Sequence, residues 1–150
     1  MKLVCSLAII SIIFFSCQSS GEEKSSSSLK GTWKLLTGTL VENGKTTVTD
    51  YSKDISFIKI INDDHFAFLQ HDLHKGKDSS AVFVAGGGRY TLKDSTYTEH
   101  LEYCNDRQWE GNDFSFVVTI KNDTLVQQGI EKIDSIGVNR MNTERYVRMK

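Results

Sequence analysis

From Gly31 to the last residues, the chain alternates between short runs of strand-forming residues and short turns, and this pattern most constrains its fold. The turns include Asn43-Gly44 and Asn62-Asp63-Asp64. Asn-Gly between two such runs is the strongest short signal for a β-hairpin. No stretch repeats apolar residues at helical spacing for more than two turns. The sequence therefore predicts an all-β protein, a single up-and-down antiparallel β-barrel of about 8–9 strands.

The N-terminal segment has the parts of a bacterial export signal. A charged Lys2 precedes an apolar stretch that is too short to span a bilayer, and Ser16 and Cys17 end it. The run from Phe14 to Cys17 resembles the lipobox of bacterial lipoproteins, in which the cysteine is acylated and becomes the mature N-terminus. We expect residues 1–16 to be a lipoprotein signal peptide and Cys17 to carry the lipid, including palmitate. A secretory peptide with a spare thiol, or a retained membrane anchor, is the alternative.

Residues 17–28 follow as a polar segment rich in serine and glutamate, which we expect to be a flexible tether before a barrel domain at 29–150. Gln18 stands where, by resemblance to enteric sorting rules, an aspartate would retain a lipoprotein in the inner membrane. The outer membrane is therefore favoured. The pair Glu22-Glu23 resembles surface-export signals of some lipoproteins, and the sequence leaves open the periplasmic face or the cell surface.

Composition excludes several classes of function. The chain has 150 residues and a formal net charge of −1, which suits one small domain and argues against nucleic-acid binding. Cys104 is the one cysteine expected in the folded part, and no disulfide is predicted. The four histidines lack metal-binding spacing, and there is no nucleophile elbow, phosphate loop or paired-carboxylate motif. We therefore expect no enzyme activity, no metal and no cofactor.

Four sequence segments together resemble a known family. They are Gly31-x-Trp33, Gly87-Gly88-Arg89-Tyr90-x-Leu92, Tyr97-Thr98-Glu99-x-Leu101-Glu102-Tyr103 and Glu144-Arg145-Tyr146-x-Arg148. Over about residues 29–150 they resemble the lipocalin-like (calycin-type) small β-barrel lipoproteins of Gram-negative bacteria. The resemblance implies a barrel with room for a small apolar ligand. It also implies that Trp33 plugs one end, with Arg145 or Arg148 against its indole.

Alternation along the strands identifies candidate ligand-binding residues. It places Glu99 on the same face as several apolar residues, and a buried carboxylate is costly unless it is paired or hydrogen-bonded. Glu99 is then either a polar handle for a ligand or a structural partner for tyrosine hydroxyls or Arg148. We expect a ligand to enter opposite Trp33 and to contact Tyr90, Glu99, Tyr103, Phe116 and Gln127.

These observations leave two functional hypotheses. The first is an envelope protein, anchored to the membrane by its N-terminal lipid, whose barrel binds a small hydrophobic or amphipathic ligand. The alternative is a non-enzymatic structural or protein-interaction lipoprotein whose barrel is filled by side chains. A cavity larger than about 300 Å³ favours the first hypothesis. The sequence identifies no protein partner.

Overall fold

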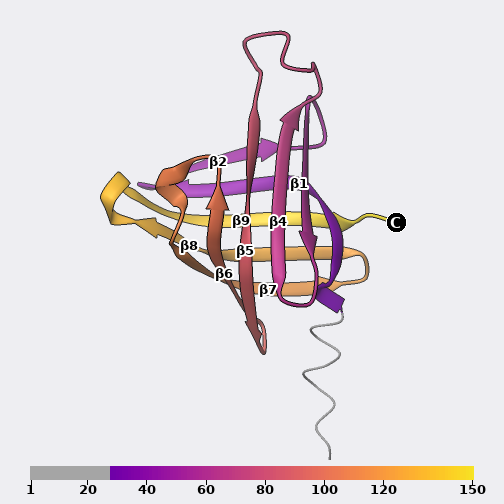
Figure 1. Ribbon diagram of the computed structural model, residues 1–150, viewed down its shortest axis with the longest axis vertical. Helices are drawn as coiled ribbons and strands as arrows, with labels where there is room; N and C mark the ends of the chain where they lie inside the picture. The colour runs from indigo at the N-terminus through magenta and orange to yellow at the C-terminus, as the bar shows by residue number, and fades with distance from the viewer. Residues whose placement is uncertain (1–27) are drawn as a thin grey trace, which may run out of the picture.

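Nine antiparallel strands and two 3-10 helices make up the fold of residues 28–150, which are the residues that the computed structural model describes (Figure 1). The predicted signal peptide, Cys17 and all of the predicted tether except Ser28 lie outside the described residues. The elements, in chain order, are β1 Gly31–Glu42, β2 Lys45–Asp50, β3 Ile55–Ile61, β4 His65–Asp72, β5 Phe83–Lys93, β6 Thr96–Cys104, η1 Arg107–Trp109, β7 Asp113–Lys121, β8 Thr124–Ile133, η2 Asp134–Ile136 and β9 Val138–Arg148.

Eight of the strands close into a barrel, which confirms the predicted all-β barrel. Each strand from β3 to β8 pairs with the next one along the chain, and β1 closes the ring by pairing with both β3 and β9. One edge of β1 is shared: its first residues pair with β3, and Thr37 to Glu42 pair with β2. The strand β2 is therefore an addition outside the closed ring, lying beside β1 in Figure 1.

The three consecutive glycines lie within β5 and do not end a strand. Three glycines within an apolar run predict a bulge or a sharp barrel corner. A bulge is present at this point: Gly87 pairs with Tyr103, whereas Gly88 pairs with Leu101. One residue of β6, Glu102, is therefore extra. A Cβ atom on Gly88 would collide with the carbonyl oxygen of His100, so glycine permits the close approach of the two backbones.

The sequence from Glu131 to Thr143 lacks a clear strand pattern and predicts a loose segment with a short helical turn near Lys132 to Ser135, and here the structure differs. The strand β8 continues to Ile133, η2 makes the turn, and β9 begins at Val138. Polar side chains inside the barrel obscure the strand pattern here, because Glu131 and Asn142 are both buried. Among the described residues, no helix has the length and apolar character needed to cross a bilayer.

Trp33 closes one end of the barrel. Its side chain is fully buried, and its indole nitrogen donates a hydrogen bond to the carbonyl oxygen of Leu29 at 2.8 Å. The family resemblance implies that Arg145 or Arg148 packs against this indole. Arg148 does so, with its guanidinium carbon 4.0 Å from the ring centre. The same guanidinium donates to the carbonyl oxygens of Lys30 and Ser28. Arg145 is exposed on β9 and does not take this role.

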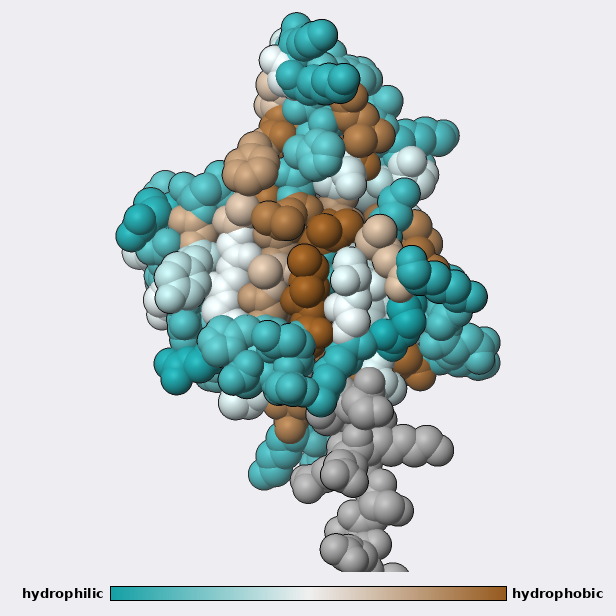
Figure 2. Space-filling model, turned by 45° about the vertical axis from the view of Figure 1, so that its right-hand side comes forward, coloured by the Kyte–Doolittle hydropathy of each residue, from teal (hydrophilic) through white to brown (hydrophobic). Residues whose placement is uncertain are grey.

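The outer surface of the barrel carries apolar side chains as well as polar ones. Ile60 on β3, Leu69 on β4 and Phe83 on β5 are exposed large hydrophobic residues on three adjacent strands. Figure 2 shows apolar side chains gathered between hydrophilic regions on the face that it presents.

Candidate functional site

A cavity of about 340 Å³ occupies the end of the barrel opposite Trp33. The two ends are distinguished along β1, since Trp33 lies near its start, whereas Gly38 and Leu40 farther along line the cavity. The lining residues range from Gln127, which is buried, to Asp106, which is exposed beside η1. The cavity thus extends from the barrel interior to the surface near η1.

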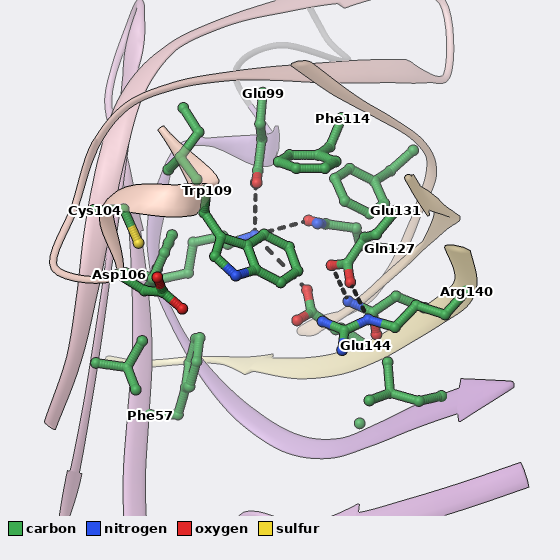
Figure 3. Close-up of a pocket in the computed structure, with 18 of the residues that line it drawn as sticks. Phe57, Glu99, Cys104, Asp106, Trp109, Phe114, Gln127, Glu131, Arg140 and Glu144 are labelled. Atoms are coloured by element: carbon green, nitrogen blue, oxygen red, sulfur yellow. Dashed lines mark hydrogen bonds and ion pairs between the residues drawn. The ribbon is translucent and has the colours of Figure 1, made fainter. Parts of the chain in front are cut away.

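Lys59 of β3 is the centre of a buried polar cluster in this cavity. Its ammonium group donates to Oε1 of Glu99 at 2.6 Å and to Oε1 of Gln127 at 3.1 Å. A carboxylate oxygen of Glu144 lies 3.8 Å away. Figure 3 shows Glu99, Gln127 and Glu144 converging from β6, β8 and β9. Three strands that lie far from β3 in the sequence therefore supply acceptors for this lysine, which is only 2% exposed.

The pKa values of this pair follow from burial and from charge. Burial alone would lower the pKa of Lys59, but the carboxylates of Glu99 and Glu144 outweigh it and raise the pKa above 10.5. Burial raises the pKa of Glu99 above its usual value, and Lys59 counteracts this effect. Lys59 is accordingly the fixed positive charge of the cluster.

A second polar group lies between β8 and β9. Both carboxylate oxygens of Glu131 accept hydrogen bonds, one from Nε of Arg140 at 2.6 Å and one from the amide nitrogen of Asn142 at 2.7 Å. The Arg140 guanidinium carbon lies 5.1 Å from the ring centre of Trp109, which is half-buried on η1. Charged side chains and an indole thus form the cavity wall near its mouth.

Three of the five residues predicted to contact a ligand line this cavity, namely Glu99, Phe116 and Gln127. Tyr90 does not. It is buried, and its hydroxyl donates to the carbonyl oxygen of Asn62 at 2.9 Å, in the turn after β3. The structural partner of Glu99 is Lys59 and not Arg148, which lies on Trp33.

The expected interior position of Tyr103 is wrong. Its side chain is 68% exposed, whereas Glu99 and Leu101 on the same strand are buried. The extra residue Glu102 in the bulge changes the alternation, so Tyr103 points outward and Cys104 points inward. Tyr103 is therefore not part of the cavity wall.

Lys59, the central residue of the buried polar cluster, is not among the residues predicted from the sequence. Lys59 lies in the run Ile55–Ile61, which is rich in β-branched and aromatic residues and carries apolar side chains on both faces of the strand. The alternation of inward and outward residues along β3 could have identified Lys59. It shares a face of the strand with Phe57 and Ile61, and all three are buried. A buried carboxylate at Glu99 also calls for a cation or hydrogen-bond donors on facing strands, and a lysine on a buried face is one such partner.

The remaining reactive side chains of residues 28–150 are not arranged as a nucleophilic or metal site. Cys104 is buried at the cavity wall, and burial raises the pKa of its thiol, which disfavours the reactive thiolate. Within residues 28–150, no group of three histidine, cysteine, aspartate or glutamate side chains is placed to hold a metal ion.

Comparison with known proteins identifies a family. No curated protein matches this chain. Residues 28–150 match the family described as "Domain of unknown function (DUF4488)". This match covers the whole barrel and most of the chain, and the protein therefore belongs to the DUF4488 family.

Proposed function

We propose that this protein is a lipid-anchored envelope protein, attached by Cys17, whose lipocalin-like barrel binds one small hydrophobic or amphipathic molecule. The observation that carries the proposal is the cavity of about 340 Å³ at the end opposite Trp33. Cavities of roughly 300–1,000 Å³ with an apolar wall and a few polar groups are typical of small-molecule sites. A barrel filled by side chains, as the alternative function requires, has no such space.

The composition of the wall supports an amphipathic ligand. Aromatic rings of Phe57, Trp109 and Phe116 provide apolar surface, and the Lys59 cluster provides polar groups at depth. A molecule with an apolar body and one polar end can satisfy both parts of such a wall.

A pair of matched tryptophan substitutions tests binding in the cavity. Val84 lines the cavity on β5, and Val117 on β7 is 56% exposed on the outside. N-phenyl-1-naphthylamine, an apolar fluorescent probe, should bind to the wild-type protein and to Val117→Trp. Val84→Trp should lose the fluorescence increase, because the indole occupies the space. Equal binding by both variants would contradict a site inside the barrel.

A further inference from the structure

We propose that the ligand of this cavity carries a positively charged end, an amine attached to an apolar body, and not a carboxylate or phosphate. This inference rests on the proposed function, because it names the class of molecule that the same cavity takes. It is carried by the distribution of charge in the cavity wall.

Acidic side chains outnumber basic ones in the wall. Lys59 and Arg140 are its two cations, and its four carboxylates are Glu99, Asp106, Glu131 and Glu144. The wall has a net charge of −2 with all six ionised, since two positive and four negative charges are present. The carboxylates remain in excess if Glu99 holds a proton. In a partly buried cavity such an excess attracts a cation and repels an anion.

Both cations are already paired. An ammonium group has three N–H donors, and acceptors from Glu99, Gln127 and Glu144 lie around that of Lys59, at 2.6, 3.1 and 3.8 Å. Arg140 donates to Glu131 at 2.6 Å. An anionic ligand would have to compete with these carboxylates and would lie close to them.

Glu144 is the partly buried carboxylate of the wall with the most capacity left, because both of its contacts are made by Oε2, whereas Asp106 lies exposed beside η1. Glu144 accepts a hydrogen bond from the Tyr146 hydroxyl at 2.7 Å, and its nearest cation, Lys59, is at the longer distance of 3.8 Å. Its side chain is 16% exposed, which leaves it accessible from the cavity. The geometry assigns Glu144 as the acceptor for the ammonium group of the ligand.

The barrel already shows how it holds a cation. The Lys59 ammonium lies 5.4–6.0 Å from the ring centres of Phe66, Tyr97 and Tyr146, in addition to its carboxylate partner. A cationic ligand would meet the same combination of groups, because further aromatic rings line the cavity together with the carboxylates. These rings belong to Tyr51, Phe57, Phe68, Trp109, Phe114 and Phe116.

Three indoles that differ in their end group test this inference: tryptamine, tryptophol and indole-3-propionate. They are titrated into the full-length protein at neutral pH and followed by calorimetry. We expect tryptamine to bind about tenfold more tightly than the neutral alcohol, and the carboxylate to bind most weakly. If the alcohol or the carboxylate binds as tightly as the amine, the inference is wrong and the proposed function stands.

N-phenyl-1-naphthylamine separates the remaining outcomes. If it binds and none of the three indoles does, the inference is again overturned while the proposed function stands. If neither the probe nor any indole binds, the proposed function itself fails.

Glu144→Gln tests the assigned acceptor, with Glu102→Gln as the matched control on the outside of β6, where Glu102 pairs with Arg89. Glu144→Gln should weaken tryptamine binding by about tenfold and leave tryptophol binding unchanged, since it removes one charge from the wall. Glu102→Gln should change neither. The midpoint of urea denaturation shows whether each variant folds. If Glu144→Gln does not fold, the preference of the wild-type protein for tryptamine over tryptophol decides the inference. An unchanged ratio of the two affinities in folded Glu144→Gln would overturn the role of Glu144.

Discussion

Replacing Lys59 with methionine is expected to lower the free energy of unfolding by about 3–5 kcal/mol, because it leaves a buried carboxylate without its cation. Glu99 is 6% exposed and has Lys59 at 2.6 Å as its ion-pair partner. Methionine has a similar length, so the loss of charge is tested more than the loss of volume. Urea denaturation followed by tryptophan fluorescence measures the change.

The double variant Lys59→Met/Glu99→Gln is the control for this effect. It removes both charges of the pair, so it should be more stable than Lys59→Met alone. The deficit of Lys59→Met should also shrink in acid. Lys59 lowers the pKa of Glu99 against the effect of burial, so its removal raises that pKa further. Folded Lys59→Met therefore binds the Glu99 proton more tightly than folded wild type, and the deficit is largest above the raised pKa and smallest below the pKa of the unfolded chain. A double variant no more stable than the single one would show that the charge pair is not the cause.

Cys17→Ala is expected to remove the protein from the membrane, because Cys17 is the proposed site of acylation. Incorporation of labelled palmitate and partitioning into detergent should both be lost. Cys5→Ala is the matched control, since Cys5 lies in the apolar part of the predicted signal peptide and should leave both unchanged. Unchanged palmitate labelling of Cys17→Ala would exclude this residue as the lipid anchor.

The barrel could be predicted from the sequence because its signals are local. Alternation, Asn43-Gly44 and the other turns each depend on a few neighbouring residues, and the structure confirms about nine strands. The alternation of inward and outward residues gave a wrong face only where the backbone departs from regular strand geometry. The bulge at Glu102 adds one residue, and every inference beyond it on β6 changes face, which moved Tyr103 outward.

The site was less predictable because it depends on contacts between distant strands. Alternation along the strands identified Glu99 and Gln127 as interior residues. Their shared partner Lys59 is 40 residues from Glu99 and 68 from Gln127 in the sequence. A lysine in an apolar strand is usually exposed, and its burial is tolerated here because three facing strands supply acceptors. Sequence alone does not give that register.

Native mass spectrometry of the protein purified from the cells that make it tests most directly whether the barrel carries a small molecule. The account predicts a species heavier than the acylated chain by the mass of one small molecule, released as a cation when the complex is dissociated. The Val84→Trp variant should lack this species, and Val117→Trp should retain it. A wild-type protein that shows only the mass of the acylated chain, or a bound molecule retained equally by Val84→Trp, would contradict the account.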